Sequence, residues 1–271
     1  MFIALSFIMV LPPLGPLGPL RSGDTAASVR AATPLPEPVR VSQEEEIADL
    51  NKWKGSVNAG VTITDGNTEL TTLSAGGDAT LRREKDRITL GAFWNFQQAK
   101  NAVSGENEIS QRTSGANAQY DYFLDERTYL FGQASAENNK LADLDLRATV
   151  GGGVGYQFIE REDLKLSAEV GLAYVSEDYG SSPDAEYLSA RGAYDVAWKV
   201  NQELEILHTG VAFPSLEDSA DVYVKLDTRA RVTLTESMFA QLQWVMDWDN
   251  TPAQGAERLD NRYLLSVGWS F

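Results

Sequence analysis

The chain has 271 residues, 43% of them hydrophobic, with no cysteine, one histidine and a formal net charge of −16. The lack of cysteine excludes a disulfide framework, a thiolate metal site and a cysteine nucleophile. The acidic charge argues against a nucleic-acid-binding protein, which would present a basic surface to phosphates.

The first 52 residues show no pattern of a packed core. Phe2–Leu11 is an apolar run broken only by Ser6, shorter than the about 20 residues of a membrane-spanning helix. Its length is typical of the apolar region of a signal peptide, although no Lys or Arg precedes it. Seven of the ten prolines then lie between residues 12 and 38, which disfavours a core. We expect a signal peptide over 1–30, or otherwise a disordered tail, and a periplasmic linker over 31–52.

From Trp53 onward, apolar and polar residues alternate with a period of two, which predicts strands with one apolar and one polar face. Between Leu146 and Phe158, for example, Val150 and Tyr156 share the apolar face, and Arg147 lies on the other. Twelve such runs begin near Trp53, Glu69, Arg87, Gln111, Thr128, Asp145, Leu164, Ala185, Glu203, Asp221, Met238 and Asn261. Most have 11 to 14 residues, more than the about 5–6 typical of soluble proteins. A tilted membrane strand needs about 9–11.

These runs predict an all-β fold, a transmembrane antiparallel up-and-down β-barrel of about 12 strands over 53–271, in the bacterial outer membrane. Short charged turns alternate with longer polar loops, except at the tight Asp65-Gly66 hairpin. Short turns face the periplasm in such barrels, so we expect both termini there. Aromatic residues near strand ends, such as Trp94 and Trp198, resemble interfacial girdles. The alternative is a soluble β-sandwich or lipocalin-like barrel, and residues 31–52 could alternatively form a plug.

The last run places alternate residues on one face, namely Tyr263, Leu265, Val267, Trp269 and Phe271. This arrangement resembles the carboxy-terminal insertion signal of bacterial outer-membrane proteins. The resemblance implies the barrel-assembly machinery as a partner during biogenesis. Outer-membrane lipid and lipopolysaccharide are the other expected partners, and the oligomeric state is not indicated.

Five segments together resemble the YdiY-like family of salt-induced outer-membrane proteins, also classed as a domain of unknown function. They are Trp53–Ser56, Thr64–Glu69, Pro214–Asp218, Asp249–Ala253 and Gly268–Phe271. The likeness covers roughly residues 53–271. Its name implies a link to salt stress, and it implies no catalytic or ligand-binding residues.

No motif predicts an enzyme, a cofactor or a metal site. The distant alternative function is an outer-membrane hydrolase. Its histidine-based catalysis would have to use His208. The phase around it is ambiguous, because Leu204 and Ile206 favour one outward face and Leu207 the other, which would fit a bulge. Two acidic motifs, 65–67 and 247–250, lack the ligand spacing of a calcium loop.

The predicted lumen carries charges of both signs. The basic residues are Lys54, Arg147, Lys165, Arg191, Lys225, Arg229, Arg231 and Arg262, and the acidic ones are Asp78, Asp121, Glu169, Asp195, Asp227 and Asp247. They predict either ion pairs that fill and stiffen a structural, envelope-stress barrel, or a narrow channel for small solutes or ions. Twelve strands lie between the about 8 that side chains fill and the 16–18 of open porins, so strand number does not decide.

Overall fold

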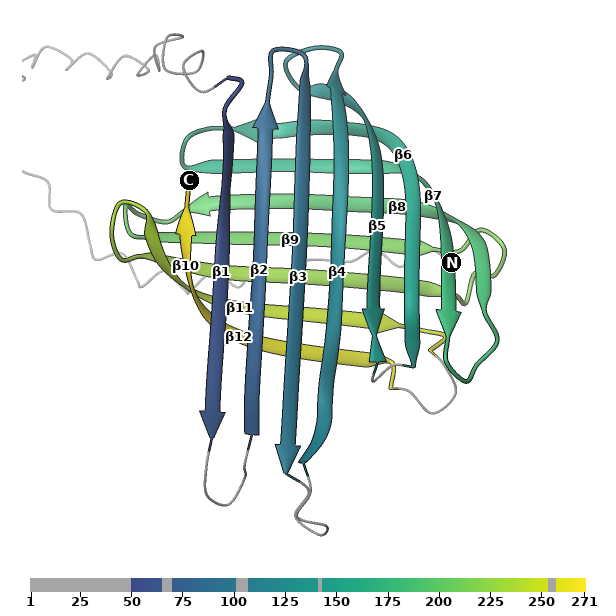
Figure 1. Ribbon diagram of the computed structural model, residues 1–271. Helices are drawn as coiled ribbons and strands as arrows, with labels where there is room; N and C mark the ends of the chain where they lie inside the picture. Colours follow the sequence, from purple (N-terminus) through teal and green to yellow (C-terminus); the bar gives the residue numbers. More distant parts are fainter. Residues whose placement is uncertain (1–49, 65–69, 101–106, 141–142, 253–256) are drawn as a thin grey trace, which may run out of the picture. The chain divides into compact units, whose positions relative to one another are not determined.

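The structure, a computed structural model, describes residues 50–64, 70–100, 107–140, 143–252 and 257–271. Within them twelve antiparallel strands form one closed barrel, in which each strand pairs with its neighbours in sequence and the first pairs with the last (Figure 1). This confirms the predicted up-and-down barrel of twelve strands. The expected signal peptide, residues 31–49 of the expected linker and the hairpin at 65–69 lie outside the described residues.

The strands begin within two residues of their predicted starts, with one exception. They are β1 (Trp53–Thr64), β2 (Leu70–Arg82), β3 (Asp86–Lys100), β4 (Asn107–Phe123), β5 (Thr128–Asn139), β6 (Leu144–Glu160), β7 (Leu164–Tyr179), β8 (Ala185–Lys199), β9 (Leu204–Pro214), β10 (Val222–Thr233), β11 (Met238–Asp249) and β12 (Leu259–Ser270). The exception is β4, which was expected near Gln111. A register shift at Gln97/Gln98 lets β3 and β4 pair as far as Lys100 and Asn107, through polar residues in which no alternation is visible.

Short turns gather at one end of the barrel, called here the turn end, and the opposite end is the loop end. The turns span residues 83–85, 124–127, 161–163, 200–203 and 234–237. In one of them Asp125 accepts hydrogen bonds from the backbone N–H groups of Arg127 and Thr128, both at 2.8 Å. These bonds favour the carboxylate and lower the pKa of Asp125. The start of β1 and the end of β12 lie at this end too, since Asn51 bonds to Arg82 and Ser270 to Ser237.

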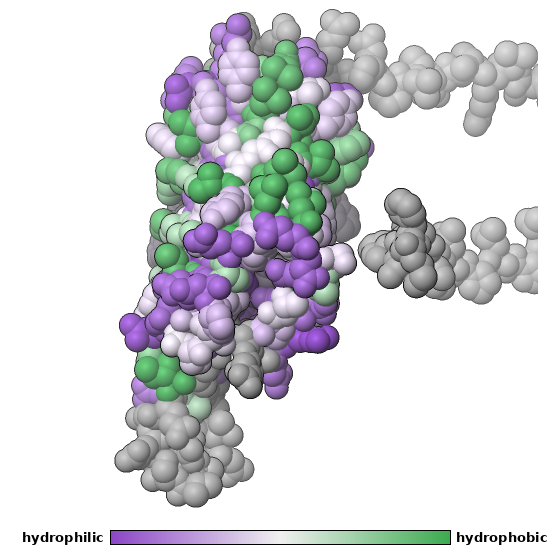
Figure 2. Space-filling view, turned by 90° about the vertical axis from the view of Figure 1, so that its right-hand side faces the viewer, coloured by the Kyte–Doolittle hydropathy of each residue, from purple (hydrophilic) through white to green (hydrophobic). Residues whose placement is uncertain are grey.

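The outer wall is apolar. On β12 exposure alternates strictly from Asn261 to Trp269, with the outward Tyr263 71% and Leu265 64% exposed, whereas Arg262 and Leu264 are buried. Figure 2 shows hydrophobic residues gathered mainly in the upper half of one side of the barrel. So much exposed apolar surface is unfavourable in water but is solvated by lipid in a bilayer. The barrel is therefore of the outer-membrane type. Within the described residues, no helix is long and apolar enough to cross a membrane.

The inner face is less polar than predicted. Phe123, Tyr129 and Phe131 form one buried cluster, and the larger residues of a second cluster are Tyr187, Phe213 and Tyr223. Arginines stack on these rings, with the guanidinium carbon of Arg82 3.5 Å from the ring centre of Phe123 and that of Arg147 3.9 Å from that of Tyr223. Aromatic side chains thus supply the volume that closes parts of a twelve-stranded lumen, and strand alternation alone does not identify them.

The seam that closes the barrel is short. β1 and β12 pair over four positions, from Ser56↔Ser270 to Ala59↔Val267, and Gly55 and Phe271 exchange two further backbone hydrogen bonds of 3.0 Å. Among the described residues, the next shortest ladder, between β8 and β9, has eight positions. The barrel is therefore closed mainly at the turn end of this seam.

Candidate functional site: the charged lumen

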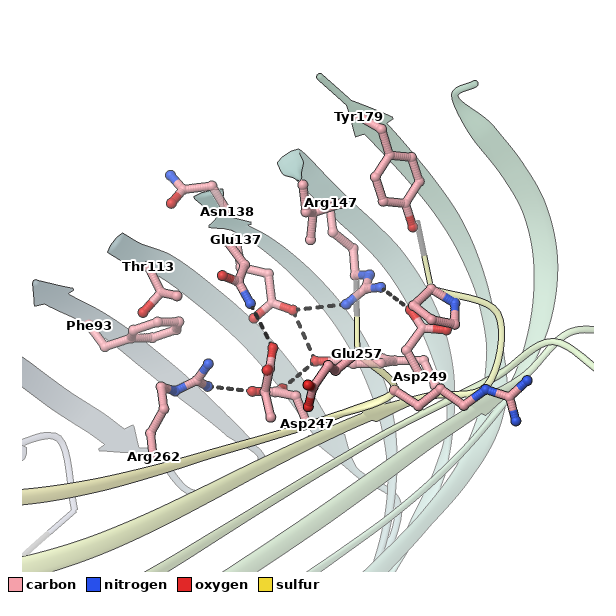
Figure 3. Close-up of a pocket in the computed structure, with 16 residues that line it drawn as sticks. Phe93, Thr113, Glu137, Asn138, Arg147, Tyr179, Asp247, Asp249, Glu257 and Arg262 are labelled. Carbon is pink, nitrogen blue, oxygen red and sulfur yellow. Dashed lines mark hydrogen bonds and ion pairs between the residues drawn. The ribbon is translucent and has the colours of Figure 1, made fainter. Parts of the chain in front are cut away.

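At the loop end, Arg147 on β6 is the centre of a buried set of ion pairs. Its guanidinium contacts Glu177 on β7 at 2.5 Å, Asp249 on β11 at 3.0 Å and Glu137 on β5 at 3.5 Å. The side chains of Arg147 and Glu177 are less than 9% exposed. Because β6 and β11 are five strands apart in the barrel, the pair with Asp249 crosses the lumen (Figure 3).

A second group of contacts continues this set from β10 to β12. The Tyr223 hydroxyl lies 2.7 Å from an Asp247 oxygen and 3.1 Å from a Glu137 oxygen, so these two carboxylates share its one proton. Lys225 pairs with Glu137, and Arg262 with Asp247. We call these residues the loop-end network: Glu137, Arg147, Glu177, Tyr223, Lys225, Asp247, Asp249 and Arg262. It joins side chains of six strands, and all its members except Glu177 and Lys225 line a pocket of about 50 Å³ (Figure 3).

At the turn end, charged groups surround the Phe123–Tyr129–Phe131 cluster. Glu169 on β7 accepts hydrogen bonds from the Tyr129 hydroxyl at 2.9 Å and from the Gln119 amide at 2.7 Å. It also pairs with Arg191 at 2.7 Å. Nearby, Arg87 pairs with the fully buried Asp121 at 2.6 Å. Aromatic volume and ion pairs therefore close this part of the lumen together.

A third group lies on the strands on either side of the seam. Arg231 on β10 contacts Gln241 at 2.8 Å, Ser56 at 3.1 Å and Asp78 at 3.2 Å. Two residues along β10, Arg229 pairs with Asp227 at 2.7 Å. Contacts from β10 to β1 and β2 thus support the seam from the inside, where its own ladder is short.

Between these groups the lumen holds a cavity of about 520 Å³, within the about 300–1,000 Å³ of small-molecule sites. Its wall includes amides, hydroxyls and glycines, among them Gly91 and Asn117. A Cβ on Gly91 would lie 2.5 Å from the Asn117 amide oxygen, so glycine leaves the room that this amide occupies. The lining allows hydrogen bonding to a hydrophilic solute or to water.

The structure brings most of the sequence-predicted lumen charges into these groups. Arg147, Lys225, Asp247 and Arg262 lie in the loop-end network, Asp121, Glu169 and Arg191 at the turn end, and Asp78, Asp227, Arg229 and Arg231 near the seam. Asp195 lines the cavity. Lys165 instead pairs with Glu160 in an exposed position at the turn end, and Lys54 is exposed near the start of β1.

Sequence reasoning missed three acidic members of the loop-end network, Glu137, Glu177 and Asp249. Glu177 falls where a long loop was expected, and Glu137 directly precedes another. Their strands extend farther, and a count of every second residue onward from Gln133 or Ala173 would have placed Glu137 and Glu177 in the lumen. Tyr223 was missed because an aromatic residue in an alternating run is normally assigned to the lipid-facing side of the strand.

His208 lies on the outer wall, with no bulge around it. The ladders of β9 with β8 and β10 run without a register shift, so the bulge hypothesis is wrong. His208 Nε2 lies 2.7 Å from the Tyr194 hydroxyl and Nδ1 lies 2.8 Å from that of Thr228. Both ring nitrogens are therefore already engaged by hydroxyl groups.

The acidic motif at 247–250 is also engaged, because Asp247 and Asp249 pair with Arg262 and Arg147. The other acidic motif, 65–67, lies outside the described residues. Among the residues that are described, no group of three or more His, Cys, Asp or Glu side chains is placed to hold a metal ion.

Comparison with known proteins gives one family and several barrels. A family model described as "Protein of unknown function, DUF481" matches residues 57–271. "Uncharacterized protein YdiY" of Escherichia coli (strain K12) is 24% identical over 253 residues, covering 92% of this chain and 94% of that protein. Among solved structures, the NanC porin has 9% identity and a TM-score of 0.46, covering 80% of this chain and 98% of its own. An outer membrane channel of Pseudomonas putida F1, COG4313, has 11% identity and a TM-score of 0.46, with coverages of 82% and 96%.

Proposed function

The chain belongs to the DUF481 family, and from this premise we propose that it is a structural outer-membrane barrel whose lumen is braced by ion pairs. The contact of Arg147 with Asp249 across the lumen carries the proposal. Side chains from six strands meet around it, so an outward movement of any of these strands would break a buried ion pair. Such pairs are costly to break, because the remaining charge is left without compensation.

We further propose the orientation and boundaries that the sequence predicts: a signal peptide at 1–30, a linker at 31–52, and a barrel at 53–271 with its turn end in the periplasm. Outward aromatic residues near that end, such as Trp53, Trp198 and Trp269, support a position at a membrane interface. The outward row of β12 supports recognition by the barrel-assembly machinery. Recovery of the protein in a soluble periplasmic fraction without detergent would overturn the location.

The braced barrel is tested by electrical recording. We expect the purified full chain to insert into planar lipid bilayers without conductance steps, because the loop-end network obstructs the lumen. The same preparation should show heat-modifiable electrophoretic mobility, which establishes that a folded barrel is present. Regular conductance steps from the unaltered chain would overturn the proposal.

The second candidate is a narrow channel for small solutes or ions, which the cavity favours. Arg229 lines the cavity, and Arg231 contacts the cavity-lining Asp78. In that case conductance steps would occur and would change in size or ion selectivity with Arg229→Glu or Arg231→Glu. We do not propose an enzymatic role. Hydrolysis of phospholipid or peptide by the purified chain, if His208→Ala abolishes it, would establish one.

A further inference from the structure

One charge in the cavity differs from all the others. Eleven charged residues line it: Asp78, Arg87, Glu137, Arg147, Glu169, Arg191, Asp195, Lys225, Asp227, Arg229 and Arg262. Ten of them form ion pairs with one another or with residues that do not line the cavity. Within the part of the chain that the structure describes, Asp195 makes neither an ion pair nor a hydrogen bond. Its carboxylate therefore faces the cavity without a direct partner.

Two hydroxyl groups flank this carboxylate. Asp195 on β8 lies directly opposite Ser167 on β7 and Thr209 on β9 in the two ladders, and all three residues line the cavity. Directly opposed residues have Cβ atoms about 4.5–5.5 Å apart. Neither hydroxyl makes a side-chain hydrogen bond among the described residues, so the three form a row of oxygen acceptors.

The cations nearest in the sequence and in the lumen are already engaged. Arg191, on the same inward face of β8 as Asp195, pairs with Glu169 at 2.7 Å. Arg87 pairs with Asp121 at 2.6 Å. Moving either guanidinium to Asp195 would leave another buried carboxylate unpaired, which is costly. A direct contact that compensates Asp195 must therefore come from outside the chain.

We propose that the Ser167–Asp195–Thr209 row binds the ammonium group of a small hydrophilic solute held in the cavity. An ammonium group has three N–H donors and no acceptor, which suits one carboxylate and two hydroxyls. A divalent metal ion is a poorer match, because calcium takes six to eight oxygen ligands, usually with several carboxylates. An anion is disfavoured, because the cations of the wall are paired and the free charge is negative.

The rest of the solute has both room and partners. The cavity of about 520 Å³ extends from this row to the loop-end network, whose Arg147 and Tyr223 also line it. The exposed Asn117 amide on β4 offers a donor and an acceptor from the wall of another strand. We infer a polyhydroxylated amine of about the size of a monosaccharide. This binding goes beyond the structural role and does not require that the lumen conduct ions.

The test uses three sugars of similar size that differ in charge. Glucosamine, glucose and glucuronate are titrated into the full folded chain in detergent micelles, at neutral pH, at which most of the amine is protonated and the carboxylates are ionised, and the heat of binding is measured. Glucosamine should bind at least about ten-fold more tightly than glucose, because a hydrogen bond to a charged group adds about that much affinity. Asp195→Asn should remove this ten-fold difference and leave the glucose affinity unchanged.

The control is Asp163→Asn, which removes the same charge from an exposed turn and should leave glucosamine binding unchanged. Retained heat-modifiable mobility shows that each variant is folded. The proposal is overturned if glucosamine does not bind, if glucuronate binds as tightly, or if Asp195→Asn binds glucosamine as well as the unaltered chain. None of these outcomes depends on conductance, so the proposal can fail while the braced barrel stands.

Discussion

The two ends of the lumen are closed by ion pairs and aromatic side chains in different proportions. At the loop end, Arg147, Lys225 and Arg262 meet four carboxylates, and every charge has a partner on another strand. At the turn end, Phe123, Tyr129 and Phe131 pack together, and ion pairs surround them. The Tyr187–Phe213–Tyr223 cluster also lies at the loop end, so the two ends differ in proportion: the loop end depends more on complete pairing, and the turn end more on aromatic volume. A single lost charge should therefore damage the loop end most, whereas a single added methyl group should damage the turn end.

The largest effect is expected for Arg147→Met, which leaves Glu177 and Asp249 buried without their shared cation. Loss of one partner from a buried ion pair costs about 3–5 kcal/mol. Urea unfolding of the refolded barrel measures this loss in the free energy of unfolding. The matched control is Arg161→Met in a turn, where the exposed pair with Asp163 should be worth at most about 1 kcal/mol. Equal effects of the two changes would remove the distinction between the loop-end network and a surface pair.

A smaller effect is expected for Gly155→Ala, where the new methyl group would lie 2.2 Å from the ring of the fully buried Tyr129. Overpacking of this kind costs about 1–3 kcal/mol. Gly132→Ala is the control, because a Cβ there meets no atom within 4 Å. The same unfolding measurement compares the two. If Gly155→Ala lowers the free energy of unfolding no more than Gly132→Ala does, the packing at the turn end is not tight enough to exclude a methyl group.

The smallest effect is expected when the same change, Tyr to Phe, is made at the loop end and at the turn end. Tyr223→Phe removes a hydroxyl whose proton is shared by two carboxylates, Asp247 and Glu137, and Tyr129→Phe removes one that donates to Glu169. Each loss should cost about 1–2 kcal/mol in the free energy of unfolding, with the larger cost at Tyr223. A larger cost at Tyr129 would contradict the view that hydrogen bonding to charge matters more at the loop end.

The fold could be predicted because lipid imposes a strict period of two. The runs that begin at Trp53, Thr128, Leu164, Ala185 and Met238 start where the strands start, since an apolar residue is required at every second position. The start of β4 could not be predicted, because Asn107–Ser110 are mainly polar on both faces. Strand ends beyond the apolar band carry no such signal.

Whether a charged residue faces the lumen or the lipid follows from its position in the alternating pattern. The residue with which it pairs cannot be read from that pattern. Arg147 and Asp249 are brought together by the stagger of strands around a closed barrel, which no local pattern encodes. The inward placement of Tyr129 and Tyr223 was hidden because aromatic residues occur on both faces. Asp195 was placed in the lumen from the sequence, whereas its lack of a partner becomes visible only when all its neighbours are known.

The short seam between β1 and β12 has a consequence for how the barrel is made. A sheet of twelve strands has two open edges until these strands join, and four residue pairs with two flanking hydrogen bonds complete the join. Closing this seam therefore creates the closed topology with the fewest residue pairs of any ladder described. Amide hydrogen exchange at Val57 and Ala59, whose N–H groups face β12 as that of Gly55 does, would then report reopening of the cylinder, separately from the loss of its walls.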